Sequence, residues 1–233
     1  MKFTKNRQFV GKMFDEISPT YDTLNHFMSG FQDIRWRKKA VKYLLSLNRL
    51  YKNILDLASG SGDFGKEFLK LKPRRIYSVD ISLEMLKINR QKINNNINHQ
   101  IKADSENLPF VNNCCDLCGI AFGIRNFENL DKCLKEIHRV LNDNGILFVI
   151  EMFKPHSDRL FDKSFKFYFE KLIPKLGNSV SKSKYAYDYL CDSVDNFLPV
   201  DNFISLAQDS GFTLIRKVNN FSGIVYSVCL VKE

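Results

Sequence analysis

The chain has 233 residues, 44% of them hydrophobic, which is enough for one α/β domain with a sizeable core. Its formal net charge is +9, but the basic residues are spread along the chain, so charge alone does not select nucleic acid or a membrane surface as a partner. No apolar run approaches the roughly 18 residues that a membrane span needs. The charged start lacks an apolar stretch behind it, so we expect a cytosolic protein.

Short apolar runs alternate with amphipathic segments from residue 53 onward. This alternation predicts a parallel sheet with helices on both faces. Two more apolar runs near the C-terminus bring the expected strands to seven. The expected strands are 53–57, 75–80, 99–103, 115–121, 145–151, 212–218 and 223–231, and the expected helices are 63–71, 83–95 and 128–141.

Two segments lie outside this alternation: 1–49, with helical patterning over 31–47, and 156–197. We expect both to carry substrate selection within a single domain, 1–233. In the second, apolar residues over 161–176 recur at three- and four-residue spacing with lysines between them, which predicts a basic amphipathic helix. That helix packs on a neighbour, or it forms an apolar lid or a membrane-touching face.

Six cysteines raise the question of a metal site, because Cys115 and Cys118 form C-x-x-C. Zinc needs four ligands, whereas Cys133, Cys191 and Cys229 stand apart from this pair. The segment that begins at Cys115 is better interpreted as a buried strand, where free cysteine behaves as a small apolar residue. We therefore expect no metal.

Residues 54–65 pass from an apolar strand into a glycine turn, the layout of a nucleotide-binding loop. Gly60, Gly62 and Gly65 satisfy G-x-G-x-x-G literally. Asp80 follows about 20 residues later, where an acid takes ribose hydroxyls. This pattern alone favours NAD.

Two carboxylates argue against a dinucleotide. Asp56 ends the strand and Asp63 opens the helix, where a pyrophosphate would need free N–H donors. A carboxylate about 4 Å from a phosphate costs about 4 kcal/mol at the effective dielectric near a protein surface. Both acids suit a cationic ligand, and S-adenosylmethionine (SAM) offers a sulfonium, an ammonium and a ribose for Asp80 to hold.

Asp104 and Ser105 follow the third expected strand, the usual position for contacts to the adenine of SAM. Asp104 can accept the exocyclic amine and Ser105 can reach the ring, although an Asx or Ser turn closing the loop is the alternative. Ligands bind where the carboxyl ends of parallel strands meet. The residues expected to face that crevice are Asp56, Asp80, Asp104 and Phe122.

The glycine loop resembles motif I of the class I SAM-dependent methyltransferases, and residues 79–86 resemble the segment that follows it. Two further patterns are more specific. They are Tyr21-Asp22-x-Leu24-Asn25 with Ser29, Asp33 and Trp36, and Gly123-Ile124-Arg125-Asn126 leading through Arg139-Val140-Leu141 into Ile150-Glu151-Met152-Phe153-Lys154-Pro155. With them, nearly the whole chain resembles the menaquinone/ubiquinone biosynthesis C-methyltransferase family.

The resemblance implies a Rossmann-like class I methyltransferase: a seven-stranded, mostly parallel sheet with helices on both faces and an antiparallel C-terminal edge hairpin. It implies methyl transfer from SAM to a ring carbon of a polyprenylated quinol. We favour demethylmenaquinol as the acceptor, and the benzoquinol of the ubiquinone pathway is the alternative. The implied partners are the quinol and a peripheral membrane surface but no nucleic acid, and a homodimer is left open.

Residue roles follow from the same resemblance. The expected cofactor-binding residues are Asp56, Gly60, Ser61, Gly62, Asp80, Asp104 and Ser105, and the expected substrate-binding residues are Tyr21, Asp22, Asn25 and Trp36. Arg125 is the candidate for a fixed cation that eases ionisation of the quinol hydroxyl beside the reacting carbon, with Asn126 as its hydrogen-bonding partner.

Each role has an alternative. Arg125 could pair with a carboxylate such as Glu151, and Tyr21 and Trp36 could serve packing. The base is open between a water polarised by Arg125 and the side chains of Asp22, Tyr21 or His26, the last of which is also interpretable as a surface or capping histidine.

The sequence departs from the family pattern at several positions. Ser61 replaces the usual threonine, Asp33 replaces a histidine three residues before Trp36, and residues 142–145 replace a Lys-Pro-Gly-Gly turn.

Three rival functions remain. A nucleic-acid methyltransferase fits the charge, but the chain lacks an Asn/Asp-Pro-Pro-Tyr/Phe motif and a paired catalytic cysteine. The literal glycine fingerprint supports an NAD-dependent oxidoreductase. A non-catalytic SAM-binding protein is the third.

Overall fold

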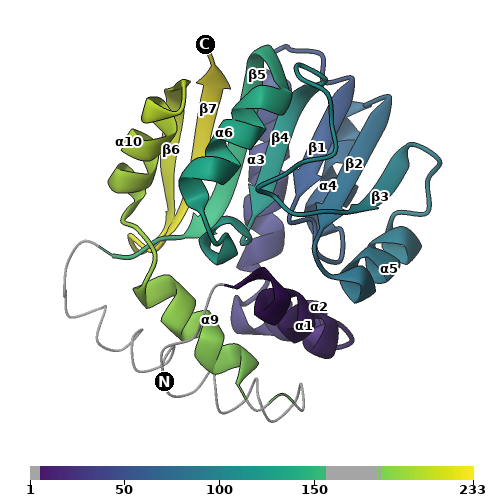
Figure 1. The fold of residues 1–233 in the computed structure, drawn as a ribbon, viewed down its shortest axis with the longest axis vertical. Coiled ribbons are helices and arrows are strands. Elements are labelled where there is room, and N and C mark those ends of the chain that lie inside the picture. The colour runs from purple at the N-terminus through teal and green to yellow at the C-terminus, as the bar shows by residue number, and fades with distance from the viewer. Residues whose placement is uncertain (1–5, 156–182, 184) are drawn as a thin grey trace.

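The computed structural model describes residues 6–155, 183 and 185–233 (Figure 1). Within them, seven strands form one sheet in the order β3-β2-β1-β4-β5-β7-β6. The first five strands run parallel, and β7 pairs antiparallel with both β5 and β6. The strands are β1 (Asn53–Leu57), β2 (Arg75–Asp80), β3 (Asn98–Lys102), β4 (Cys115–Ala121), β5 (Leu141–Met152), β6 (Phe212–Phe221) and β7 (Val225–Lys232). The expected sheet with its antiparallel C-terminal hairpin is confirmed.

One strand begins earlier than expected. β5 pairs with β4 at Leu141, four residues before the expected start, and then from Ile146 onward. Residues 142–145 bulge out opposite Asp116, and Asn144 has a φ of +62°. The predicted turn is therefore a bulge inside the strand, because the pairing of Leu141 holds the chain on both sides of it.

Helices cover both faces of the sheet (Figure 1). α3 and α4 pack on one face, α6 and α10 pack on the other, and α5 lies against β2 and β3. The spacing of buried residues explains these faces: in α6, Cys133, Leu134 and Ile137 recur at helical intervals. The helices are α3 (Gln32–Ser46), α4 (Asp63–Phe68), α5 (Leu83–Lys92), α6 (Leu130–Val140) and α10 (Val200–Asp209), and the short 3₁₀ turns are η1 (Leu69–Leu71) and η2 (Ile124–Asn126).

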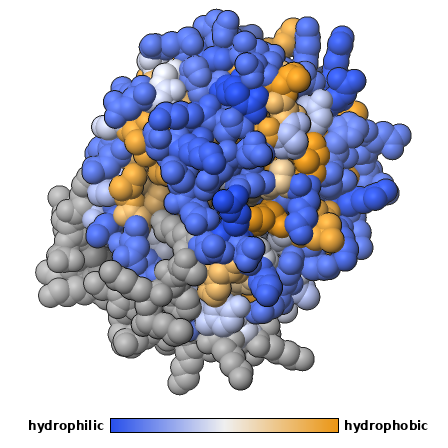
Figure 2. Space-filling view, in the orientation of Figure 1, coloured by the Kyte–Doolittle hydropathy of each residue, from blue (hydrophilic) through white to orange (hydrophobic). Residues whose placement is uncertain are grey.

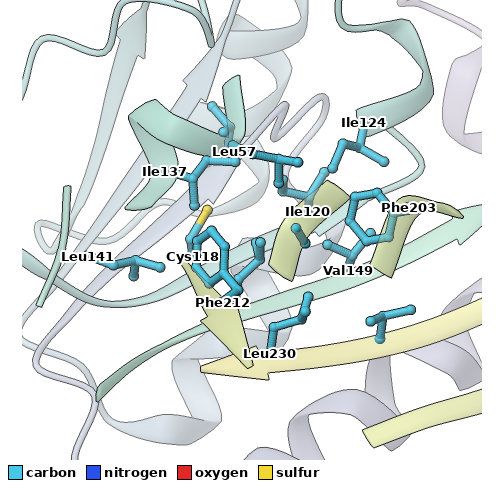
Figure 3. Close-up of a cluster of buried hydrophobic side chains, with 14 of the residues drawn as sticks. Leu57, Cys118, Ile120, Ile124, Ile137, Leu141, Val149, Phe203, Phe212 and Leu230 are labelled. Carbon is cyan, nitrogen blue, oxygen red and sulfur yellow. The ribbon is translucent and has the colours of Figure 1, made fainter. Parts of the chain in front are cut away.

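The larger core cluster lies between the sheet and α6 and α10 (Figure 3). There Ile120 and Val149 from the strands meet Ile137 and Phe203 from the helices. Cys118 belongs to the same cluster and Cys115 is also buried, which confirms the interpretation of C-x-x-C as part of a strand. The outer surface of this half of the molecule is mostly hydrophilic (Figure 2).

Three more helices lie beyond the carboxyl ends of the parallel strands (Figure 1). α1 (Arg7–Ile17), α2 (Tyr21–Met28) and α9 (Ala186–Asp195) share a third apolar cluster, in which Met13 and Tyr187 are almost fully buried. They cover the edge at which the sequence predicts the site. The amphipathic helix expected over 161–176 lies outside the described residues.

Across the described residues, no helix is long and apolar enough to cross a membrane.

Candidate active site

A first cavity, here called the loop cavity, lies at the carboxyl ends of β1, β2 and β4 beneath α1. The strands and the loops after them supply most of its wall, and residues of α1, α2 and α5 supply the rest. Its lining includes Leu57, Ala58, Gly60, Val79, Asp80, Ile81, Met85, Asp104, Ser105, Phe122, Gly123, Asn126 and Phe127, with Arg7, Val10, Phe14 and Tyr21 from the N-terminal helices.

Two strained turns shape this cavity. Ala58 follows β1 with a φ of +53°, and Phe122 follows β4 with a φ of +61°. Both are left-handed conformations that cost a side-chain-bearing residue energy and that cluster at functional sites. A Cβ on Gly123 would lie 2.4 Å from the Ala58 Cβ, so only glycine lets the two turns approach this closely.

Asp80 fixes the glycine loop to β2. Its Oδ2 accepts from the Gly60 N–H at 2.8 Å and its Oδ1 accepts from the Ser82 N–H at 2.8 Å. Burial raises the pKa of Asp80. The carboxyl lines the loop cavity with Gly60, as expected for a group that holds ribose hydroxyls.

Asp104 and Ser105, from the loop after β3, line the loop cavity, as expected. Asp104 forms an ion pair with Arg7 of α1, and Arg7 Nε also lies 3.7 Å from Glu128. The hydroxyl of Ser105 lies 3.2 Å from the Cys133 thiol. Sequence reasoning missed Arg7, because one basic residue in a charged N-terminal stretch gives no signal of a contact across the cavity.

The structure corrects the expected placement of Asp56 and Asp63, which do not face a cationic ligand beside the glycine loop. Asp56 is absent from the lining of the loop cavity: it is buried behind it, where a Cβ on Gly65 would lie 2.8 Å from its Oδ2. Burial raises the pKa of Asp56 well above its usual range. Asp63 lies 2.6 Å from Lys92 Nζ, which neutralises it. The choice of cofactor therefore rests on Asp80 and on Asp104 rather than on these two acids.

Ser61 and Asp22 also lie away from their expected places. The Ser61 hydroxyl donates to the Asp22 carboxylate, and Lys92 Nζ lies 2.6 Å from Asp22 Oδ2 and 3.0 Å from Ser61 Oγ. Ser61, Gly62 and Asp22 line neither the loop cavity nor the second cavity described below. Their contacts tie α2 to the glycine loop, so Asp22 is not placed against a substrate in this structure.

A second cavity of about 500 Å³, here called the apolar cavity, lies between α1, α2, α3 and α9. Tyr21, Asn25 and Trp36 line it, as expected for substrate-side residues. Most of its wall is apolar. The apolar lining includes Met13, Ile17, Phe27, Met28, Met152, Leu190, Phe221 and Val225, and the charged lining among the described residues consists of Asp33, Arg37 and Arg125.

The two cavities share a wall. Phe14, Tyr21 and Phe122 line both of them. The neighbouring residues Arg125 and Asn126 divide between them, with Arg125 on the apolar cavity and Asn126 on the loop cavity. Ligands in the two cavities would thus meet at this wall.

Arg125 is 5% exposed and held on three sides. Its Nη1 lies 2.6 Å from Glu151 Oε1 and 2.8 Å from the Phe122 carbonyl, and its Nε donates to Ser193 Oγ at 3.2 Å. Among the described residues, Nη2 has no hydrogen-bond partner. Burial alone would lower the pKa of Arg125, but Glu151 outweighs it and raises this pKa, so the guanidinium stays charged. The pairing with Glu151 that the sequence left open is present.

Tyr21 and Asn126 are further polar groups at this wall, since Tyr21 lines both cavities and Asn126 lines the loop cavity. Burial raises the pKa of Tyr21 to about 12, although Arg125 and Arg37 oppose the shift. Tyr21 is therefore a neutral phenol at physiological pH. Asn126 Oδ1 accepts from the Tyr189 hydroxyl at 3.2 Å.

Asp33 is a site residue whose role sequence reasoning missed, since the family pattern included its position and marked it as a departure but gave it no role. It accepts from His26 Nδ1 at 2.7 Å, Arg37 Nη1 at 2.6 Å and Ser29 Oγ at 2.7 Å. Burial raises the pKa of Asp33, but Arg37 and Ser29 outweigh it and lower the pKa overall. Asp33, His26 and Asp63 bring their ligand atoms within 4.8 Å of one another, while Arg37 and Lys92 balance the carboxylate charges.

The loop cavity fits SAM by its chemistry. Asp80 can accept from ribose hydroxyls and Asp104 from an adenine amine, while apolar Val79 and Ile81 border the space between them. A parallel sheet with an antiparallel hairpin at its edge, and such a cavity at the carboxyl ends of its strands, define a class I SAM-dependent methyltransferase.

Comparison with known proteins narrows the class. Residues 1–232 match the model of the ubiE/COQ5 methyltransferase family. The chain is 37% identical to a demethylmenaquinone methyltransferase of Chlorobaculum parvum over 90% of this chain and 86% of the relative. It is 35% identical to a ubiquinone/menaquinone biosynthesis C-methyltransferase of Rickettsia bellii over 97% and 93% of the two chains. The chain therefore belongs to the ubiE/COQ5 methyltransferase family and uses SAM as its methyl donor.

Solved structures support the fold. A SAM-dependent methyltransferase from Thermotoga maritima superposes with a TM-score of 0.62 over 95% of this chain and 98% of its own, at 18% identity.

Proposed function

We propose that this chain transfers the methyl group of SAM to a ring carbon of a polyprenylated quinol, with demethylmenaquinol as the preferred acceptor. Relatives that match most of the chain bear the name demethylmenaquinone methyltransferase, which supports this acceptor. We place the reaction on the cytoplasmic side, with the enzyme in peripheral contact with the membrane that holds the quinol.

The wall shared by the two cavities carries the proposal. A methyl transfer needs the acceptor carbon in line with the methyl group and its sulfur, which requires donor and acceptor to occupy adjoining sites. Phe14, Tyr21 and Phe122 border both cavities, so a ring in the apolar cavity would lie next to a ligand in the loop cavity. The apolar lining suits a prenylated ring and would exclude water from it.

On the donor side, bound SAM supplies an electrophilic methyl group on its sulfonium. Asp80 would hold its ribose, and Asp104 with Ser105 would hold its adenine. Gly60 lines this cavity, and a Cβ there would meet no protein atom within 4 Å, so the loop backbone is open to the ligand. Asp104 would exchange its ion pair with Arg7 for the adenine contact.

On the acceptor side, a ring carbon becomes nucleophilic when the neighbouring hydroxyl ionises. Arg125 would stabilise the phenolate through Nη2, and the Tyr21 hydroxyl would donate to the same oxygen. Asp22 and His26 line neither cavity, and Tyr21 is neutral, so these three side chains no longer compete for the role of base. We retain a solvent molecule beside Arg125 as the acceptor that passes the hydroxyl proton to bulk water. After methyl transfer, the methylated ring carbon loses its hydrogen as a proton to solvent, which restores the aromatic ring.

Product analysis distinguishes the two quinols. The purified chain is incubated with SAM and, in separate reactions, with demethylmenaquinol or with the benzoquinol precursor of ubiquinone. Mass spectrometry should find one added methyl group on demethylmenaquinol and slower or no addition on the benzoquinol. Methylation of the benzoquinol alone would replace the preferred acceptor, and methylation of neither quinol, with RNA methylated instead, would overturn the proposal.

A further inference from the structure

The outer face of α3 is basic from Arg35 to Lys42. α3 buries Trp36, Ala40 and Leu44 against the sheet. The exposed residues of its opposite face recur at intervals of one, three and four, which places them on one stripe. They are Phe31 at the start of the helix, followed by Arg35, Lys38, Lys39 and Lys42, and the exposed residues of the last turn, Leu45 and Ser46, are uncharged. The one acid of α3, Asp33, is buried, so this stripe carries cations without an acidic partner of its own.

The basic stripe extends onto the neighbouring helix. Lys38 shares a shallow surface depression with Lys66 and Lys70 from α4 and η1. The acid in this depression, Glu67, pairs with Lys70. The depression therefore adds net positive charge beside α3, and an anionic surface is what this charge complements.

Aromatic side chains stand at the N-terminal end of the stripe. Phe27 is 72% exposed and Phe31 is 56% exposed, which is unusual for side chains of this size. They flank the turn between α2 and α3, where Gly30 and Phe31 have φ values of +57° and +60°. A phenylalanine in this left-handed conformation is strained, and strain persists at functional positions.

The aromatic end of the stripe is also the end at which the apolar cavity reaches the surface. Phe27 lines that cavity and yet is largely exposed, and Met28 and Gly30 of the same turn line it as well. A ligand in the apolar cavity would have a path along Phe27 to the outside. Exposed aromatic residues, a row of cations and the mouth of an apolar cavity thus lie on one side of the molecule.

We propose that this side, formed by Phe27, Phe31 and the basic stripe of α3, docks on the anionic headgroups of a lipid bilayer. The cations contact the headgroups and the two phenyl rings enter the interface, as in amphipathic helices that lie on membranes. The apolar cavity then opens toward the hydrocarbon, so that a prenyl tail stays in the bilayer while its ring enters the enzyme. This last clause rests on the proposed quinol substrate, whereas the docking does not.

Vesicle sedimentation tests the docking. The purified chain is mixed with vesicles of phosphatidylcholine, or of phosphatidylcholine and phosphatidylglycerol in equal parts. We expect binding to the anionic vesicles that is at least about tenfold tighter than to the neutral ones and that weakens with added salt. Absence of binding to the anionic vesicles would overturn the proposal.

Matched variants locate the surface. Phe31→Ser, and separately the double variant Lys39→Glu with Lys42→Glu, should each weaken binding about tenfold or more. The controls are Leu50→Ser, which removes another exposed apolar side chain, and Lys87→Glu with Arg90→Glu, which makes the same charge change on α5. Equal losses in tests and controls would reject this face.

Further outcomes separate other partners and the substrate. If the charge variant loses RNA binding while Phe31→Ser leaves vesicle binding unchanged, this face binds nucleic acid. If Phe31→Ser converts a dimer to a monomer while vesicle binding stays intact, this face binds a second copy of the chain. Either result overturns the proposal. Phe31→Ser should methylate a short-chain, water-soluble quinol at the parent rate and lose activity on a long-chain quinol in vesicles. A parent protein that binds vesicles but methylates no quinol would reject the proposed function and leave the docking standing.

Discussion

The Arg125 guanidinium lies 2.6 Å from the Glu151 carboxylate, and both side chains are buried beside the apolar cavity. Breaking a buried ion pair by removing one partner strands the other charge and costs about 3–5 kcal/mol. Arg125 therefore has a structural role as well as the proposed catalytic one, and an experiment must separate the two.

Arg125→Ala should destabilise the fold by about 3–5 kcal/mol and abolish most turnover. The double variant Arg125→Ala with Glu151→Gln removes both charges and should recover much of the stability, measured by urea unfolding, without recovering turnover. SAM binding by the double variant, measured by calorimetry, should stay near the parent value. Recovery of turnover together with stability would show that Arg125 acts only through folding.

Tyr21→Phe removes the hydroxyl at the wall between the cavities. The loss of a hydrogen bond to a developing phenolate should lower kcat about 10- to 100-fold while SAM affinity is retained. Because the pKa of Tyr21 is raised to about 12, Tyr21 should not ionise between pH 7 and 10. The pH profile of kcat over this range should therefore have the same shape in the parent protein and in Tyr21→Phe. Tyr43→Phe on α3 is the matched control, and an equal loss of kcat there would contradict the role.

Lys92→Met removes the cation that joins α2 to the glycine loop through Asp22 and Asp63. The Lys92 side chain is 19% exposed, so the network is only partly screened by solvent. We expect a loss of about 1–2 kcal/mol in the free energy of unfolding and weaker SAM binding, because the loop loses its anchor. Lys87→Met, on the same helix but 58% exposed, should change stability by less than about 0.5 kcal/mol. Similar effects of the two substitutions would rule out this anchoring.

Asp56→Asn tests the burial of Asp56 by its pH dependence. The pKa of Asp56 is raised in the folded state, so the folded protein binds more protons than the unfolded one, and stability falls as pH rises above the unfolded pKa. The asparagine side chain does not ionise, so it adds no such loss of stability at higher pH. The stability of Asp56→Asn relative to the parent should therefore rise between pH 4 and pH 8, by at most about 1.4 kcal/mol per pH unit. Asp131→Asn, on the surface of α6, should show no such trend in urea unfolding.

The sheet was predictable because its signals are local. The alternation of apolar runs, the glycine turn after β1 and the positions of Asp80 and Asp104 at strand ends each depend on a few consecutive residues. The pairing of Leu141 before the bulge was not predictable, because it depends on a partner in another strand.

The parts of the site that sequence reasoning missed depend on contacts between distant segments. In the sequence, Asp56 and Asp63 both flank the glycine loop. In the fold, Asp56 lies against Gly65 of α4, whereas Asp63 forms an ion pair with Lys92 of α5. The pairing of Arg7 with Asp104 spans 97 residues. No pattern in the sequence specifies which charges will meet when helices from the N-terminal segment fold over the sheet.

The position of the transferred methyl group is the most direct test of C-methylation of the quinol by this chain. The chain is incubated with SAM carrying a ¹³C-labelled methyl group and with demethylmenaquinol, and the product is examined by NMR. We expect one labelled methyl group bonded to a ring carbon. A labelled methyl group on oxygen, or no transfer from bound SAM to the quinol, would contradict it.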